Sequence, residues 1–397
     1  MFFSRYPIEF EIVPFPGIRK VLDRLQEKYE VSYFSMGWSK GSNLELRKGL
    51  SIKEIPLKVD PSSSFDKWLK TILYYAFLPL TILSLKLQKP DVVICKETFP
   101  FVPYLLGSCN IPLIIETGDW WPSIFLNGSK LGRKVAFAIE SSEVKRWNNL
   151  NCVAIAHTKA AGEAVITRGL KSDHIQFVPP PMFGGIYSDN KKENSRLLRK
   201  KLKLNEKDFI VTLHGIIHPS KGYDQVLSWW ADLVKIHPDW KLLFIGGTMG
   251  EGWFNKMIID LKLEKNVIMA GWISDQRLLK DYLNASDCLL VTRRNTFENK
   301  GTIPSGLTHS LMTGKPTVVT GMQGIREIVQ DRKNGYLFEP DNYDSFKKSL
   351  EDVYYNQKKA SKIGIAGIKR IKEYFDTETA AKRYDSIISK IIKKSEQ

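Results

Sequence analysis

The stretch Thr292–Pro316, TRRNTFENKGTIPSGLTHSLMTGKP, predicts the fold around it and holds the best candidate site. An apolar run after Asp287 precedes it and another from Thr317 follows it. A strand, a polar loop, a short helix and a second strand therefore form one βαβ crossover. Ligands of open parallel sheets bind beyond the carboxyl ends of the strands, so we expect a ligand at this loop.

The chemistry of this loop suits an anion. Gly301, Ser305 and Gly306 let backbone N–H groups approach a phosphate closely, and the helix that begins near them adds the positive end of its dipole. Full positive charges come from Arg293, Arg294 and Lys300. The alternative is an ordinary solvated loop between a strand and a helix.

Length and composition limit the class of protein. A chain of 397 residues exceeds the size of one growing core, so two domains are expected. The net charge of +16 suits nucleic acid, an anionic membrane surface or phosphorylated small substrates. No zinc-finger, RNP-like or basic-region pattern appears, which argues against nucleic acid.

The 4 cysteines lie far apart and no metal-ligand spacing occurs, so we expect reduced thiols and no structural metal. The N-terminus lacks the features of a secretory signal, which favours the cytoplasm.

Both halves of the chain repeat the same alternation of strands and helices. Ile18–Tyr29 has the pattern of an amphipathic helix. Short apolar runs predict strands that are buried on both faces of a parallel sheet. In the first half they cover Ile8–Phe15, Val31–Met36, 91–96, 112–117, 152–158 and 175–180; in the second they cover 209–215, 241–247, 266–272, 287–292, 315–320 and 335–340.

A proline- and glycine-rich stretch from Pro179, followed by a basic run to Lys201, breaks this pattern. We therefore expect a Rossmann-like domain at residues 1–187, a linker at 188–205 and a second Rossmann-like domain at 206–375. Residues 376–397 continue a basic helical segment that we expect to cross back to the first domain.

The segment Trp68–Leu87 is unusually apolar. It carries no charge between Thr71 and Leu85, but it is shorter than the ~20 apolar residues of a spanning helix and contains Pro79. We expect a helix that is buried against the sheet. The alternative is contact with a membrane surface through an exposed apolar face.

Three smaller motifs bear on chemistry. His214-GIIHPSKG sets Gly215 at a strand end and Lys221 in the next turn, as a diphosphate clamp requires; the alternative is a helix-capping turn with a surface lysine. The glycines around Gly247 are not in the order of a dinucleotide loop, which excludes a nicotinamide site there. Asp119 follows a strand and precedes two tryptophans, which suits a carboxylate facing a sugar hydroxyl, or a helix N-cap.

Together these motifs resemble the retaining glycosyltransferases of family 4. The resemblance covers most of residues 206–355 through the order of its motifs: the Lys221-Gly222 turn, the strand ending in Gly246-Gly247, VIMAGWISDQRLLKDYLNASDCLLV, SLMTGKPTVVT, and GIREIV before NGYLFEPD. In the first half, Asp119-Trp-Trp-Pro is similar to a signature of some of these enzymes. The resemblance implies a GT-B fold, with two Rossmann-like domains facing across a cleft. It also implies a nucleotide-sugar donor in the second domain, an acceptor in the first, and no metal or other cofactor.

The chain departs from the family at two glutamates that flank the donor. Their places fall at Gly301 and His309, so we expect Glu298 to take the first role and His309 to bond a ribose hydroxyl. The family's arginine beside Gly215 is replaced by Ile216, which leaves Lys221 and Arg293 or Arg294 for the diphosphate.

The resemblance implies a glycosyltransferase. The apolar segment from Trp68 with its flanking lysines, together with the large positive charge, leads us to expect a lipid-linked or membrane-surface acceptor, as in the assembly of cell-surface glycans, and peripheral membrane contact. Asp119, Lys221 and Glu298 are the catalytic candidates. The donor-binding candidates are His214, Gly215, Lys221, Gly247, Arg293, Arg294, Gly301, Ser305, Gly306, Leu307, Thr308 and His309. The alternatives are an inactive glycosyltransferase-like binding subunit and a nucleotide-sugar epimerase on the same fold.

Overall fold

A computed structural model describes residues 1–4, 17–36, 49–55, 64–96, 101–117, 126, 129–183, 185, 187, 192–218, 221–247, 252–273 and 275–396. The expected strand Ile8–Phe15 lies outside these residues, and the first strand that the structure records is Phe2–Phe3.

The chain divides into two units. Unit 1 contains Met1–Met182 and Phe375–Gln397, and unit 2 contains Phe183–Tyr374. The last helix, α17 (Thr377–Glu396), therefore belongs to unit 1, as expected for a segment that crosses back.

The expected linker at 188–205 is not a separate segment. Within it, helix α9 (Lys192–Lys201) packs on α12 (Gln276–Ala285) of unit 2. Leu198 is buried in the same cluster as Leu279 and Leu283, and Arg199 donates a hydrogen bond to the Ala285 carbonyl. Because most residues of this segment are polar or basic, its sequence did not indicate a helix. The helix packs on unit 2 through one apolar side.

Unit 1 is built on a seven-stranded parallel sheet in the order β3-β2-β1-β4-β5-β6-β7. The strands are β1 (Phe2–Phe3), β2 (Ser32–Met36), β3 (Ser51–Ile55), β4 (Val93–Cys95), β5 (Leu113–Glu116), β6 (Cys152–Ala156) and β7 (Ile175–Phe177). Helices of this unit besides α17 are α2 (Ile18–Gln26), α4 (Ser64–Gln88), α5 (Val102–Gly107), α7 (Lys130–Trp147), α8 (Lys159–Thr167) and the 3₁₀ turn η1 (Ser172–His174). Strand β3, SIKEI, was not predicted, because its two charged residues interrupt the apolar run.

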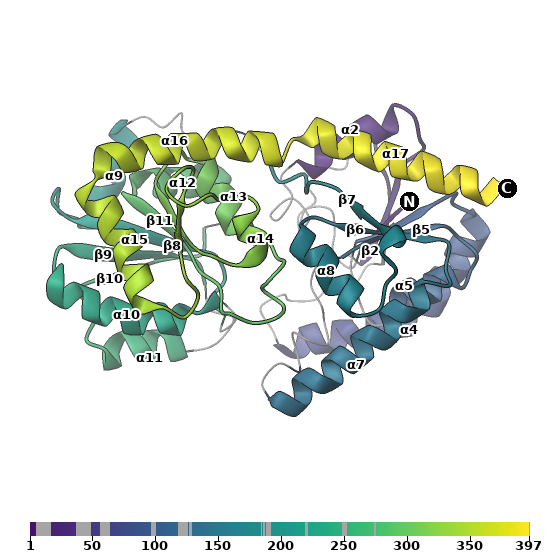
Figure 1. The fold of residues 1–397 in the computed structure, drawn as a ribbon, viewed down its shortest axis with the longest axis horizontal. Coiled ribbons are helices and arrows are strands. Elements are labelled where there is room, and N and C mark those ends of the chain that lie inside the picture. Colours follow the sequence, from purple (N-terminus) through teal and green to yellow (C-terminus); the bar gives the residue numbers. More distant parts are fainter. Residues whose placement is uncertain are drawn as a thin grey trace. The chain divides into compact units, whose positions relative to one another are not determined.

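Helices cover both faces of this sheet. Successive side chains of a strand point to opposite faces, so Phe2 packs with α2 and α17, whereas Phe3 packs with α4, α5, α7 and α8. Figure 1 shows α2 and α17 on one side of the sheet and α4 and α7 on the other.

The apolar segment Trp68–Leu87 lies within α4, whose interior contains Pro79. Leu78 and Leu85 are buried against the sheet, which confirms the expected packing. Among the described residues, no helix is long and apolar enough to cross a membrane.

Unit 2 is built on a six-stranded parallel sheet in the order β10-β9-β8-β11-β12-β13. The strands are β8 (Phe209–His214), β9 (Trp240–Ile245), β10 (Val267–Gly271), β11 (Cys288–Val291), β12 (Thr317–Thr320) and β13 (Tyr336–Phe338), so all six predicted strands of this half are confirmed. Its other helices are α10 (Tyr223–Ile236), α11 (Trp253–Asp260), α13 (Ser305–Met312), α14 (Gln323–Arg326), α15 (Tyr343–Tyr355) and α16 (Gln357–Tyr374).

The strand order in unit 2 reverses at β8, which lies between β9 and β11. At such a switch point, the loops that follow the two neighbouring strands run in opposite directions and leave a crevice. The loops after β8 and β11 are those that the sequence singled out. The fold of two parallel-sheet, Rossmann-like units confirms the predicted α/β class.

A buried polar contact attaches α17 to the first sheet. Glu116, at the end of β5, accepts a hydrogen bond from the Tyr384 hydroxyl of α17. The Lys96 ammonium lies 3.3 Å from the other carboxylate oxygen of Glu116, and both charged side chains are almost completely buried.

We predict that Glu116→Ala lowers the free energy of unfolding by about 3–5 kcal/mol, because it removes the carboxylate that neutralises a buried ammonium. Tyr384→Phe, which removes one hydrogen bond from the same carboxylate, is expected to cost about 1 kcal/mol. Urea denaturation of both variants measures the difference. Equal losses in the two variants would contradict a role for the charge pair.

Candidate functional site

The candidate site lies in unit 2, at the loops that follow β8 and β11 and at the first turn of α13. Strand β8 ends at His214 and β11 ends at Val291. Because these strands are neighbours and parallel, their carboxyl ends lie at the same edge of the sheet. The residues that follow them therefore meet there.

Lys221 lies against Gly215. The space that a β-carbon on Gly215 would fill is only 2.9 Å from the Lys221 Nζ, and Gly215 has a φ of +117°. A larger residue at this position would be strained and would displace the ammonium. The Thr292 hydroxyl donates a hydrogen bond of 2.7 Å to the Lys221 carbonyl, which ties the turn to the loop after β11.

The ammonium of Lys221 is in an unfavourable environment. Burial, and then the nearby charge of Arg293, lower the pKa of Lys221 from 10.5 to about 7. Both causes disfavour the charged form of the lysine, so an anion bound beside it would relieve them. A lysine with a strongly lowered pKa at a strand end is a mark of a functional site.

The two candidate arginines have different surroundings. Arg294 forms an ion pair with Asp224 of α10, and about a third of each side chain is exposed. Arg293 acts electrostatically on Lys221 and donates a hydrogen bond to the Thr292 carbonyl. Arg293 is therefore the better placed of the two to act together with Lys221 on an anion.

Helix α13 directs its N-terminus to the same place. Pro304 precedes it and offers no side chain to cap the first turn, although the Leu307 N–H donates to the Pro304 carbonyl at 2.9 Å. A β-carbon on Gly306 would lie 3.6 Å from Nε2 and Cε1 of His214, so α13 meets the end of β8. Uncapped N–H groups and the helix dipole favour an anion here.

Three aromatic rings form a row beside this turn. The His309 ring stacks on His214 at a centroid distance of 5.8 Å and on Tyr187 at 6.0 Å. Burial, with the charges of His309 and Lys221, lowers the pKa of His214 to about 3, and burial lowers that of His309 to about 4. Both imidazoles are therefore neutral at pH 7.

Both ring nitrogens of His214 are buried and have no hydrogen-bond partner among the described residues. A buried polar group without a partner costs free energy, and native proteins keep few of them. His214 therefore provides an independent sign of a ligand at the start of α13, because a bound hydroxyl or phosphate oxygen would satisfy it.

Glu298 and Gly301 lie in the loop between β11 and α13. One carboxylate oxygen of Glu298 is buried without a partner among the described residues. The Gly301 carbonyl lies 2.7 Å from the place of a β-carbon on Gly324, and the Gly324 N–H donates to the Lys300 carbonyl at 2.7 Å. This close backbone packing holds the loop against α14.

Three further candidates, Gly247, Thr308 and Asp119, have different surroundings. Gly247 accepts a hydrogen bond of 3.0 Å from the Ile217 N–H, which joins the loops after β8 and β9. Thr308 is buried in the first turn and a half of α13. Asp119 lies outside the described residues, so its role stays a prediction.

Sequence reasoning missed Tyr187 and Thr292. Tyr187 was placed at the end of the first domain, but its N–H donates to the Met312 carbonyl of α13 at 2.8 Å. No local pattern marks such a contact. Thr292 was quoted in the loop without a role, although a hydroxyl that directly follows a buried strand was a usable signal.

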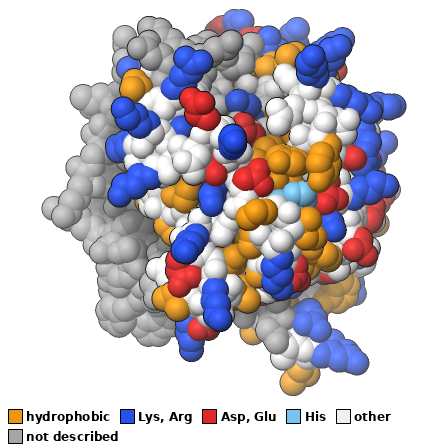
Figure 2. All heavy atoms as spheres, turned by 90° about the vertical axis from the view of Figure 1, so that its left-hand side faces the viewer, with side chains coloured by type: hydrophobic (Ala, Val, Ile, Leu, Met, Phe, Trp, Pro, Cys, Tyr) orange, Lys and Arg blue, Asp and Glu red, His pale blue; other side chains and the backbone are white. Residues whose placement is uncertain are grey.

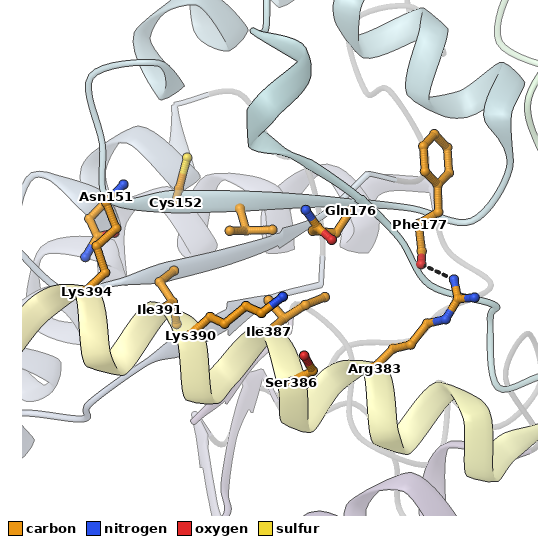
Figure 3. A pocket seen from close by; sticks show the side chains of 11 residues that line it. Asn151, Cys152, Gln176, Phe177, Arg383, Ser386, Ile387, Lys390, Ile391 and Lys394 are labelled. Atoms are coloured by element: carbon orange, nitrogen blue, oxygen red, sulfur yellow. Dashed lines mark hydrogen bonds between the residues drawn. The ribbon is translucent and has the colours of Figure 1, made fainter.

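A cavity elsewhere contains none of the candidate residues. It has a volume of about 280 Å³ and lies between α17 and the strands β6 and β7 of unit 1. Figure 3 shows Arg383 of α17 donating a hydrogen bond to the Phe177 carbonyl at one end of it. Lys390 and Lys394 lie along the same helix, so this is an open basic hollow at the sheet edge.

On the face that Figure 2 shows, lysines and arginines are spread over the surface with carboxylates among them. Within the part of the chain that the structure describes, no group of three or more His, Cys, Asp or Glu side chains is arranged to hold a metal.

Comparisons with known proteins agree with the geometry. Residues 194–370 match the family model described as "Glycosyl transferases group 1". The putative glycosyltransferase EpsD of Bacillus subtilis (strain 168) is 23% identical over 192 residues, which are 47% of each chain. The UDP-Gal:alpha-D-GlcNAc-diphosphoundecaprenol alpha-1,3-galactosyltransferase of Escherichia coli is 26% identical over 161 residues, 40% of this chain and 39% of that protein. The matched regions thus span about half or less of these relatives.

The crystal structure of Anabaena HepE in complex with UDP and glucose has a TM-score of 0.71 with this chain, at 16% identity, and covers 98% of both chains. This likeness extends over both units and confirms the GT-B fold. The family match confirms the resemblance to the group 1 glycosyltransferases for residues 194–370. Membership of family 4 and retention stay predictions.

We predict that the affinity for inorganic pyrophosphate decreases as pH rises above about 7, since the free protein must then take up a proton on Lys221. Below that pH the ammonium is already charged and its contribution is complete. The loss is about tenfold per pH unit until the raised pKa of the bound state is reached.

Lys221→Arg is the matched control, because a guanidinium stays charged throughout this range. Calorimetric titration of both proteins gives the ratio of their affinities at each pH, which removes the titration of pyrophosphate itself. A ratio that does not change between pH 6 and 9 would contradict the assignment.

Proposed function

We propose that this chain, whose residues 194–370 form a domain of the glycosyl transferases group 1 family, is a glycosyltransferase that moves a sugar from a nucleotide-sugar donor to an acceptor hydroxyl. The observation that carries the proposal is the desolvated Lys221 ammonium, held beside Gly215 at the switch point of a parallel sheet.

The diphosphate of the donor lies between Lys221 and the start of α13. Lys221 and Arg293 neutralise the charge that grows on the departing diphosphate, and the N–H groups of residues 305–308 bind its oxygens. HepE, which has the same fold, was crystallised with UDP and with UDP-glucose. A uridine or other nucleoside diphosphate sugar is therefore the class of donor that we infer.

The sugar transfer itself needs little covalent chemistry from the protein. The acceptor oxygen bonds to the anomeric carbon from the side on which the bond to the diphosphate breaks, and the hydroxyl proton passes to the departing phosphate oxygen. The configuration is retained. Charge stabilisation and positioning supply the catalysis, without a metal.

Gly301 and His309, which are both uncharged, stand at the places of the family's two glutamates. His309 has an uncharged imidazole that can bond a ribose hydroxyl, and both ring nitrogens of the adjoining His214 are buried without a partner among the described residues. Glu298, whose buried carboxylate oxygen lacks a partner among the described residues, provides the carboxylate for the sugar.

The acceptor is bound by unit 1, and Asp119 orients it or the sugar. We infer a lipid-linked acceptor on the cytoplasmic face of a membrane, in the assembly of a cell-surface glycan. The E. coli relative that matches part of this chain is named for a sugar on diphosphoundecaprenol, which is such an acceptor.

We predict that Lys221→Ala lowers kcat for transfer by about a hundredfold or more, because the removal of one preorganised donor costs roughly 3 kcal/mol of barrier. Nucleotide release from a panel of nucleotide sugars, with and without lipid-phosphate acceptors, measures it. Lys256→Ala, on the exposed surface of α11, is the control and keeps full activity. Donor binding without any turnover in the wild-type protein would instead identify an inactive binding subunit.

We predict that Glu298→Gln lowers kcat at least tenfold and leaves the donor KM almost unchanged, because the amide keeps the shape but loses the charge that is needed in the transition state. Steady-state kinetics with saturating acceptor separates the two constants. A higher KM at unchanged kcat would show that Glu298 only binds the ground state.

A further inference from the structure

The face of α4 that points away from the sheet is apolar over its whole described length. Leu80, Leu83 and Leu87 are 60%, 54% and 77% exposed, and Ile72 is 44% exposed. These positions recur every three or four residues, so they share one side of the helix, with Ala76 and Pro79 exposed between them. The opposite side carries the buried Leu78 and Leu85.

The first half of α7, on the same side of the sheet, also exposes apolar residues. Leu131 and Val135, one turn apart on the helix, are 72% and 43% exposed. The second half of α7 instead packs Val144 and Trp147 into the core that also holds Leu78 and Leu85 of α4. Both helices thus cover the same face of the first sheet, opposite α2 and α17, and Figure 1 shows them running along that side of unit 1.

Every exposed charge within these two stretches is positive. Residues 72–90 and 129–139 contain no aspartate or glutamate. Lys86 and Lys89 adjoin the leucines of α4, and Arg133 and Lys134 lie among the exposed apolar residues of α7. The first acidic residue after this part of α7 is Glu140, which is buried in a pair with Arg168.

We propose that the outer faces of α4 and of the first half of α7 form a docking surface for an anionic lipid bilayer. A chain surface that is apolar in the middle and cationic at its edges matches the interfacial region, where leucines enter the acyl boundary and lysines meet lipid phosphates. The exposed apolar residues that share one side of α4 mark an interaction site rather than ordinary surface.

The charge favours a bilayer over a protein partner. Within residues 72–90 and 129–139 it is of one sign, which suits an acidic headgroup layer better than a second copy of this chain, whose own surface here would repel it. This inference extends the proposed function by naming the surface that brings the enzyme to a lipid-linked acceptor.

The test compares three proteins in sedimentation with vesicles of phosphatidylcholine that contain phosphatidylglycerol, at low salt and without nucleotide. The wild type is expected to sediment with the vesicles. The variant Leu80→Gln/Leu83→Gln/Leu87→Gln is expected to bind at least about tenfold more weakly, because three apolar side chains no longer leave water.

The matched control is Ile236→Gln/Ile259→Gln/Ile365→Gln. These isoleucines are 53%, 61% and 60% exposed but lie on unit 2, so their replacement should leave vesicle binding unchanged. Urea denaturation shows that each variant is folded. A further variant, Lys86→Gln/Lys89→Gln/Lys134→Gln, should lose about fivefold in affinity per lysine for the same vesicles.

Wild-type protein that stays in the supernatant would overturn the proposal, as would equal binding by the leucine variant. A wild type that dimerises without lipid and a leucine variant that is monomeric would assign the surface to a second copy instead. Donor binding, measured by calorimetry without vesicles, tests the donor site of the proposed function separately, so failure of one proposal is distinguishable from failure of the other.

Discussion

The contact between Lys221 and Gly215 is the constraint on which the candidate site depends. An ammonium is brought next to a glycine with a left-handed backbone, and any side chain at that glycine would occupy the place of the charge. The protein accepts the cost of desolvating the ammonium because the rest of the edge is arranged for an anion: the uncapped start of α13, the charge of Arg293 and two neutral histidines. Without a bound anion, the buried Lys221 ammonium and its repulsion by Arg293 only destabilise the fold. A site that binds an anion therefore explains this arrangement better than a purely structural role.

In the proposed site, the neutral His309 stands where the family resemblance places a carboxylate. A carboxylate at position 309 would be buried beside His214 and would need a donor at all times, whereas a neutral imidazole can either donate or accept. The same neutrality keeps the row from repelling Lys221. Neither ring nitrogen of His214 has a hydrogen-bond partner among the described residues, which supports a bound ligand.

Much of the fold was readable from the sequence, and the exceptions have physical causes. Five of the six strands of unit 2 are almost continuously buried apolar runs, so sequence pattern and burial agree, whereas the edge strand β10 is apolar although it is partly exposed. β3 escaped prediction because, as an edge strand, it carries charge, and α9 escaped because basic residues masked its apolar side. In the site, Lys221 and Gly215 follow from local motifs. The choice of Arg293 over Arg294 and the contribution of Tyr187 depend on contacts between distant segments, which no local pattern contains.

The two units put similar layers to different uses. Unit 2 concentrates its polar chemistry at the carboxyl ends of β8 and β11 and covers the rest of its sheet with amphipathic helices. Unit 1 leaves one side of α4 uncovered, at a place where water must surround three leucines. A soluble domain has a simple remedy for such exposure, since polar residues at those positions would keep the buried side of the helix unchanged. The packing of α4 therefore does not require its exposed side to be apolar. An exposed side that combines leucines with flanking lysines and arginines can bind both the acyl chains and the phosphate groups of a bilayer.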